Sequence, residues 1–281
     1  MGEAFVAVAN DPSAIYWNPA GLASIQTREA AVSHVDWPAE IHYDHATLVL
    51  PSRRLGGSLA FQFGVLGTNI DETSETAPFG TGRTFTYSDV VAGMTFARRW
   101  TDKLLVGVGA KYLHEDLGTD IGAPAISAML FDVGSIYYLG LGSVRIATSL
   151  SNFGSELKPS GNYVSPYSGE VRTYDGYDPP MVFRYGVAFE PIENATQRLT
   201  TSIEMNQPAD NQQVLKAGLE WSYRRVFALR TGYNFRADAM KFSTGVGFAS
   251  QFGSVRGTLD YAFTDGGPLG SIHRLSLGVR L

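Results

Sequence analysis

Hydrophobic and polar side chains alternate with a period of two along most of this chain. Residues 274–281 place four aliphatic side chains on one face of an extended strand, and arginine, serine and glycine on the other. Residues 180–190 alternate in the same way, with Phe183, Tyr185 and Val187 on one face. Repeated along a chain, this pattern is typical of a transmembrane β-barrel, because in lipid only a closed sheet satisfies every backbone hydrogen-bonding group.

Turn-forming residues divide the alternating region into fourteen predicted strands. An even number of strands brings both ends of a barrel to the same side of the membrane, and the links alternate between short and long, as periplasmic turns and extracellular loops do. We therefore predict an all-β fold, a 14-stranded antiparallel transmembrane β-barrel formed by residues 27–281. The predicted strands lie near 28–36, 40–50, 57–67, 85–99, 103–115, 125–139, 144–152, 180–190, 199–206, 213–223, 226–235, 240–252, 255–264 and 271–281.

The first residues, 1–26, do not alternate in this way. Asp11-Pro12 and Asn18-Pro19 are turn signals on either side of one predicted helical turn, which Asp11 can cap. A compact segment of this kind fits inside a wide barrel. We predict that residues 1–26 form an N-terminal plug in the lumen.

Composition narrows the class of protein. Charged residues make up 17% of the chain and the net charge is -5, so a basic surface for nucleic acid is not expected. Mean hydropathy is -0.05, and the apolar runs fall far short of the roughly 20 residues that a membrane-spanning helix needs. The chain has no cysteine, which excludes disulfides and thiolate metal sites. No cofactor is predicted.

The histidines do not predict catalysis or a metal site. None of the five lies in a nucleophile motif such as G-x-S-x-G, so we do not expect an enzyme. His42 and His45 are three residues apart and face opposite sides of a strand, so they make a poor metal pair. His34 could approach one of them across the first hairpin, but we interpret these side chains as ordinary polar groups near a barrel rim.

Three stretches resemble one known family. Residues 5–23, which include Trp17-Asn18-Pro19-Ala20-Gly21, resemble the N-terminal plug motif of the PorV/PorQ family, which is related to the FadL family of hydrophobic-compound transporters. Residues 151–154 resemble its Asn-Leu-Gly element with Phe for Leu, and residues 204–211 resemble its Asp-Leu-Asn-x-Pro-x-Asp-Asn turn. The resemblance implies a plugged, fourteen-stranded outer-membrane barrel. The residues that match the plug motif are Asn10, Asp11, Pro12, Trp17, Asn18, Pro19, Ala20 and Gly21.

If the apolar faces of the strands meet lipid, charges of both signs face the lumen. Buried charges need partners, so we expect ion pairs that close the lumen around the plug rather than a continuous apolar tunnel. Four strand glycines, Gly107, Gly109, Gly245 and Gly247, would permit either a lateral opening or, as we favour, close approach of the plug to the wall. The candidate lumen charges are Arg184, Glu204, Glu220, Arg230, Arg256, Asp260 and Arg274.

Two hypotheses of function follow from the resemblance. A PorV-like protein would belong to type IX secretion and bind exported cargo proteins or secretion-system subunits. A FadL-like protein would instead take up hydrophobic small molecules across the outer membrane. Both place the protein in the lipid of a bacterial outer membrane, with a signal peptide expected upstream of residue 1. The candidate partner-binding loop, residues 154–179, carries Tyr163, Tyr167, Tyr174 and Tyr177.

Overall fold

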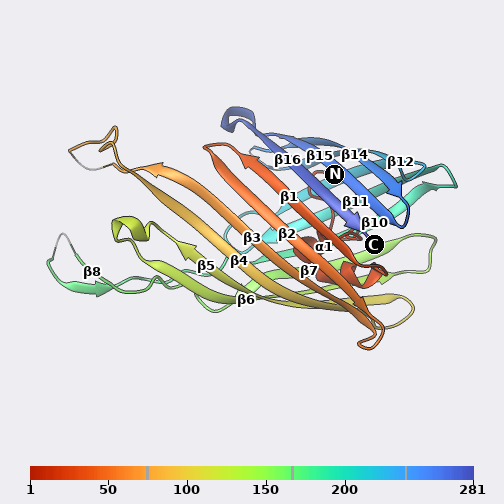
Figure 1. The fold of residues 1–281 in the computed structure, drawn as a ribbon, viewed down its shortest axis with the longest axis horizontal. Helices are drawn as coiled ribbons and strands as arrows, with labels where there is room; N and C mark the ends of the chain where they lie inside the picture. The colour runs from red at the N-terminus through yellow and green to blue at the C-terminus, as the bar shows by residue number, and fades with distance from the viewer. Residues whose placement is uncertain (74–75, 166–167, 238) are drawn as a thin grey trace.

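One closed antiparallel sheet forms the body of the molecule (Figure 1). The computed structural model describes residues 1–281 apart from 74–75, 166–167 and 238. Over these described residues, fourteen strands pair in chain order and β16 returns to pair with β1, so the fourteen-stranded, all-β barrel predicted from the sequence is confirmed. The strands are β1 (Glu29–Trp37), β2 (Ile41–Ser52), β3 (Gly57–Asp71), β4 (Thr84–Arg99), β5 (Leu104–Asp116), β6 (Ala125–Tyr138), β7 (Arg145–Gly154), β10 (Val182–Glu193), β11 (Gln197–Pro208), β12 (Val214–Tyr223), β13 (Phe227–Phe235), β14 (Phe242–Phe252), β15 (Val255–Asp265) and β16 (Ser271–Arg280).

The seam between β1 and β16 closes the sheet. The two strands pair from Glu29 opposite Arg280 to Asp36 opposite His273. At one end of the seam, Arg280 Nε donates to Glu29 Oε1 at 2.6 Å. Closure leaves neither strand with a row of unpaired backbone groups, and unpaired groups in lipid would cost several kcal/mol each.

Side chains alternate across this wall as the sequence predicts. Large apolar side chains face outward and stay exposed, as at Phe63 (53%), Val108 (56%) and Leu277 (50%). This outer belt suits the hydrocarbon of a membrane. Among the residues that the structure describes, no helix is long and apolar enough to cross a bilayer. Polar or charged side chains that are buried on the inner face include Thr95, Asp132, Arg145, Ser149, Arg184, Thr200, Ser202, Glu204 and Lys216.

The links differ in length between the two ends of the barrel. Short links of residues 53–56, 100–103, 139–144, 194–196, 224–226 and 253–254 lie at one end, which we call the periplasmic end. Most of the longer links lie at the other end, the outer end (Figure 1). The link between β7 and β10 carries a small hairpin that the sequence analysis missed, β8 (Asn162–Val164) with β9 (Val171–Thr173). Its strands are short and exposed on both faces, so they carry no alternating signal.

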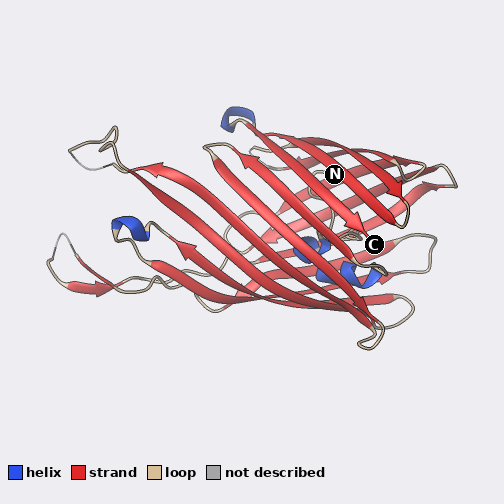
Figure 2. Cartoon of the chain, viewed as in Figure 1, coloured by secondary structure: helices blue, strands red, loops and turns tan. Residues whose placement is uncertain are grey.

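Residues 1–26, which we call the inner segment, lie inside the ring of strands (Figure 2). The segment contains α1 (Ala14–Trp17) and the 3-10 helix η1 (Pro19–Ser24), which contacts β3, β4, β5 and β6. Apolar side chains of the segment, such as Val6, Ile15 and Leu22, pack with Leu105 and other small or aliphatic side chains of the inner wall. The largest hydrophobic core of the molecule therefore lies inside the barrel.

The two faces of one strand should respond differently to the same charge. Leu277 faces outward between Val32 and Leu259, whereas Ser276 faces inward opposite Asp260. We expect Leu277→Arg to destabilise the folded barrel in lipid vesicles by about 2–4 kcal/mol, measured by urea unfolding, because arginine meets hydrocarbon there. The control Ser276→Arg gains Asp260 as a neighbour and should cost less than about 1 kcal/mol. Equal costs would contradict the assignment of faces.

Candidate functional site

Two glycines bring the inner segment against the wall. A Cβ on Gly134 of β6 would lie 2.1 Å from Asn18 Oδ1, and one on Gly107 of β5 would lie 2.4 Å from the carbonyl carbon of Pro19. Asn18 is fully buried there, and its side-chain amide donates to the carbonyl of Val6 at 3.0 Å and of Ser135 at 3.1 Å. The contact therefore requires glycine on the wall and an amide on the segment.

Glycines on other strands of the wall make room for the first residues of the inner segment. A Cβ on Gly186 would meet Val6, and Cβ atoms on Gly218 and Gly232 would meet the backbone of residues 1–2. Of the four glycines singled out in the sequence, Gly107 alone has the inner segment among its nearest neighbours. The other three face atoms of the barrel wall itself: Gly109 faces Thr95, Gly245 faces Tyr261 and Ala262, and Gly247 faces Asp260 and Arg230.

The residues of the predicted plug motif shape the inner segment. Asn18 Oδ1 also accepts from Ala20 N at 3.1 Å, which caps η1, and Pro19 occupies its first position. Gly21 has no room for a side chain, because a Cβ would lie 2.2 Å from the carbonyl oxygen of Ala9. Trp17 packs edge-on against Phe5. Pro12 and Ala20 are buried, and Asn10 is exposed.

The inner segment carries two carboxylates, Glu3 and Asp11, and Asp11 lies just before α1. It accepts from Ser13 N at 2.9 Å and from Ser13 Oγ at 2.5 Å. Burial raises the pKa of Asp11 and outweighs both hydrogen bonds, which act in the opposite direction. The hydrogen bonds from Ser13 to the Asp11 carboxylate form a turn that precedes α1.

Glu3 fixes the start of the inner segment to two strands. Its carboxylate oxygens lie 2.8 Å from Lys216 Nζ on β12 and 3.3 Å from an Arg274 nitrogen on β16. Burial alone would raise the pKa of Glu3, but the two cations outweigh it and hold the pKa below its usual range. The sequence analysis listed Arg274 but missed Glu3. The signal for Glu3 was available in the sequence, because it is the one charged residue in the stretch 1–10 and so needs a partner on the barrel wall.

Two more charged groups of the wall bind the backbone of the inner segment. Glu204 on β11 is fully buried and accepts from the backbone N–H groups of Phe5 and Val6 at 2.7 Å each. Arg145 on β7 donates from Nε to the carbonyl of Ala7 at 2.6 Å, and it pairs with Glu190 through both terminal nitrogens. The sequence analysis did not single out Arg145 and Glu190 as site residues, although both lie at inward positions.

The remaining candidate lumen charges fall into three places. Arg230 lies between Glu220 and Asp260, at 2.6 Å and 2.5 Å, and forms an ion-paired group within the wall. Arg184 lies over the rings of Tyr16 and Trp17 and donates to Ser151 Oγ. Arg256 joins neither group, since it donates to the carbonyl of Arg225 at a periplasmic turn.

The outer half of the lumen carries an apolar surface instead. Ile126, Ala128 and Leu130 line the inward face of β6, and Leu157 from the long outer link packs on them, 1% exposed. We call these four residues, with the partly buried Leu113 and Leu117, the outer apolar cluster. The sequence analysis, which followed the charged residues, did not anticipate it. Residues 128–131 of β6 are apolar on both faces, so alternation does not show which face turns inward there.

Tyr177 holds Leu157 in this position. The backbones of the two residues form a bridge with hydrogen bonds of 2.8 and 2.9 Å, and the Tyr177 hydroxyl donates to Glu115 at 2.6 Å. Burial and the neighbouring Glu115 carboxylate raise the pKa of Tyr177, so its hydroxyl stays a donor. Of the other candidate loop tyrosines, Tyr163 and Tyr174 pack together at 5.1 Å, and Tyr167 lies outside the described residues.

The wall beside the outer apolar cluster is irregular. The pairing of β6 with β7 shifts between Phe131 and Val133, which leaves a bulge opposite Asp132. Asn152 adopts a left-handed backbone at φ 62°, and its N–H donates to Asp132 Oδ1 at 2.8 Å. Lys111 of β5 pairs with Asp132 at 2.8 Å. The bulge is therefore formed by Ser151 and Asn152, the first two residues of the stretch 151–154 that resembles a family element.

At the periplasmic end a small cavity remains between the inner segment and the wall. Its volume is about 220 Å³. The cavity is a mixed polar and apolar space beside the Arg145–Glu190 pair, and its lining includes Ala7, Ala9, Ile136, Tyr138, Glu193 and Arg198.

This arrangement is a closed antiparallel barrel with an apolar outer belt, and comparison with solved structures finds the same fold. The Ralstonia pickettii toluene transporter TbuX is similar with a TM-score of 0.59 and 12% identity, over 96% of this chain and 92% of that chain. The Pseudomonas putida toluene transporter TodX is similar with a TM-score of 0.58 and 13% identity, over 100% of this chain and 97% of that chain. The monoaromatic hydrocarbon channel CymD has a TM-score of 0.58 and 14% identity, over 98% and 93%. No protein-family model and no curated protein matches at the sequence level.

Contact between the inner segment and the wall should depend on Gly134. We expect Gly134→Ala to displace Asn18, because the new Cβ would overlap its Oδ1, and so to raise ion conductance through the barrel in planar bilayers. The matched control is Gly257→Ala on β15, where a Cβ would meet nothing within 4 Å. Conductance of Gly134→Ala equal to that of the control would contradict this role of the glycine.

The lowered pKa of Glu3 has a consequence for stability. The stabilisation is complete above the ordinary pKa of 4.5 and is lost as the pH falls through the lowered pKa of the folded protein. Glu3→Gln should therefore be less stable than the wild type at pH 7, by roughly 1 kcal/mol, and the difference should disappear in acid. Thermal unfolding of the detergent-solubilised barrel over a pH series measures it.

The control for this series is Asp102→Asn, an exposed carboxylate in the link 100–103. It should change stability little at any pH. A Glu3→Gln difference that persists unchanged in acid would show that Lys216 and Arg274 do not act through the charge of Glu3.

Proposed function

We propose that this protein is an outer-membrane channel for hydrophobic small molecules and that the outer apolar cluster is the site where they bind. The observation that carries this proposal is Leu157, an aliphatic side chain of the long outer link that is buried on an apolar patch of the lumen wall. The fold likeness to proteins described as toluene transporters and monoaromatic hydrocarbon channels supports the same class of ligand. We expect no enzymatic activity.

A ligand would enter by taking the place of Leu157. An aromatic or aliphatic molecule offers Ile126, Leu130 and Leu113 the same apolar contacts, at about 25 cal/mol for each Å² removed from water. The cost is the release of one leucine and of its bridge to Tyr177. Exposing a buried leucine side chain costs about 1.5–3 kcal/mol. A hydrophobic molecule that buries a similar apolar area in the same place gains a comparable free energy, so it can replace Leu157.

A charged pair below the outer apolar cluster limits where a bound ligand can move next. Lys111 and Asp132 lie between the cluster and the inner segment, and an apolar molecule that crosses them would have to separate a buried ion pair. The bulge at Asp132 lies in the wall beside Leu130, where the β6–β7 ladder is already interrupted. Sideways passage through this wall into the membrane is therefore the favoured route.

Uptake should fail when the outer apolar cluster becomes charged. We expect Leu130→Asp to reduce uptake of radiolabelled toluene by whole cells at least tenfold, towards the rate of cells without the barrel. Leu157→Ser should instead raise the initial rate, because it removes the side chain that occupies the site. The matched control is Ser127→Asp, which adds the same charge to the outward face of the same strand, three residues away.

Heat-modifiable migration in gels confirms that each variant is folded before its uptake is compared. Equal toluene uptake by the wild type and by Leu130→Asp would overturn the proposed site. Uptake no faster than in cells without the barrel, for toluene and for a long-chain fatty acid alike, would overturn the transport function.

The type IX secretion hypothesis rests on the sequence resemblance and on one surface. The β8–β9 hairpin exposes Val164 and Val171, 63% and 70% exposed, beside the packed pair Tyr163 and Tyr174. Such a hairpin suits a protein partner. A pull-down of the solubilised barrel from its native envelope would favour this hypothesis only if secreted proteins that share a C-terminal domain, or secretion-system subunits, come with it.

A further inference from the structure

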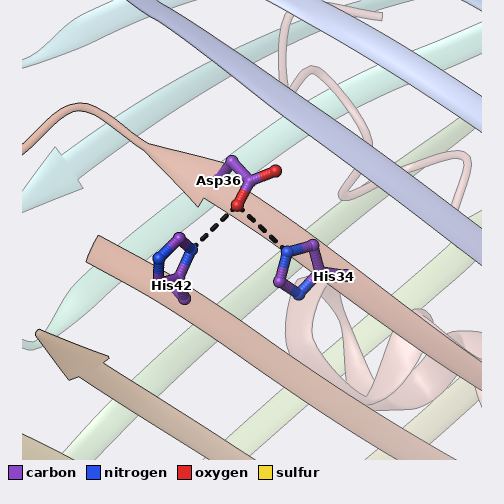
Figure 3. Close-up of side chains that lie close together, drawn as sticks. All are labelled: His34, Asp36 and His42. Atoms are coloured by element: carbon purple, nitrogen blue, oxygen red, sulfur yellow. Dashed lines mark hydrogen bonds and ion pairs between the residues drawn. The ribbon is translucent and has the colours of Figure 1, made fainter. Parts of the chain in front are cut away.

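Three side chains with metal-ligating atoms meet on the outer face of the first hairpin (Figure 3). Asp36 Oδ1 lies 3.0 Å from His34 Nε2 and 2.8 Å from His42 Nδ1. One such atom from each of the three residues lies within 4.8 Å of the others. The group lies next to the turn that joins β1 to β2, at the outer end of the barrel, and it takes no part in the contacts of the lumen.

The register of the hairpin brings these residues together. Asp36 pairs with His42 and His34 pairs with Asp44, so the four side chains share one face of two adjacent strands. The sequence analysis compared His42 with His45, and those two do face opposite sides, since His45 contacts Gln62 and Thr47 in the lumen. The correct neighbours of His42 come from the preceding strand.

We propose that His34, Asp36 and His42 bind a first-row transition metal ion of the Zn²⁺ class on the outer surface of the barrel. Two imidazoles and one carboxylate are a donor set that such ions prefer, and three protein ligands leave a fourth position open. Zinc–ligand bonds of about 2.0–2.1 Å put tetrahedral ligands about 3.3 Å apart. The carboxylate–imidazole distances of 2.8–3.0 Å need to open by only a few tenths of an ångström.

Asp44 supplies the second observation that points to a metal. Its Oδ1 lies 2.7 Å from His34 Nδ1, on the side of the ring away from Asp36. A carboxylate at this position fixes the tautomer with the proton on Nδ1 and leaves the lone pair of Nε2 directed at the ion. Metal-ligating histidines commonly have a partner of this kind, and it raises their basicity.

The metal site is separable from the channel. The ligands face away from the lumen, and His34 and His42 lie in stacked orientation at 5.9 Å across the two strands. A bound ion would therefore link β1 to β2 beside the barrel seam, where β1 also pairs with β16. Neither the outer apolar cluster nor the inner segment needs to move for the ion to bind.

The test is a titration of the full-length, detergent-solubilised barrel with Zn²⁺ in competition with a chromophoric chelator at neutral pH. We expect one equivalent to bind at micromolar concentration. Asp36→Asn, His34→Ala and His42→Ala should each weaken binding at least tenfold, and Asp44→Asn should weaken it about tenfold through its effect on His34. The control His114→Ala removes a histidine of β5 that bonds Ser127, and binding should not change.

Asp36→Asn keeps the size of the side chain, so it tests the site without a risk to the hairpin. Co²⁺ in place of Zn²⁺ adds a second measurement, because its visible spectrum reports imidazole and carboxylate ligands directly. The proposal is overturned if the wild type binds Zn²⁺ only at millimolar concentration. It is also overturned if Asp36→Asn and His42→Ala bind as tightly as the wild type.

Discussion

Closure of the sheet between β1 and β16 is the constraint on which the rest of the structure depends. A sheet in lipid must leave no backbone group unpaired, and fourteen strands is the number at which this chain closes. A barrel of about eight strands fills its lumen with its own side chains, whereas one of about sixteen leaves a water channel. The inner segment occupies the intermediate space, where Gly107 leaves room for its backbone and Gly134 for the side chain of Asn18.

Two kinds of contact hold segments inside the barrel. Charged groups of the wall bind the backbone of the inner segment, as Glu204 does for Phe5 and Val6. Near the outer end, β6 presents apolar side chains to Leu157. The first arrangement is costly to break, because each buried charge would lose its partners. The second is non-directional, so another apolar group can replace Leu157. Under the proposed function, the barrel therefore combines a firmly held inner segment with an apolar site where Leu157 can be replaced.

Alternation predicted the barrel strands because every wall position faces either lipid or lumen, and most strands carry a different polarity on each face. The strand at β6 was predicted as well, but its inward face was not, because Leu130 on one face and Met129 on the other are both apolar. The partners of Glu3 could not be predicted, since they lie more than two hundred residues away and depend on how the segment lies in the lumen. The sequence allowed His34 to approach either His42 or His45 across the first hairpin, and only the strand register shows that His42 is the one.

The two hypotheses of function meet in a single link, residues 155–181. It carries the exposed β8–β9 hairpin and also Leu157, and the Leu157–Tyr177 bridge joins the base of the hairpin to the outer apolar cluster. A partner that moved the hairpin would pull on the bridge and so on Leu157, and a ligand that displaced Leu157 would loosen the base of the hairpin. Because linked equilibria are reciprocal, each event must favour the other if either does. Under the two hypotheses, binding at the surface and binding in the lumen would therefore be coupled through this link.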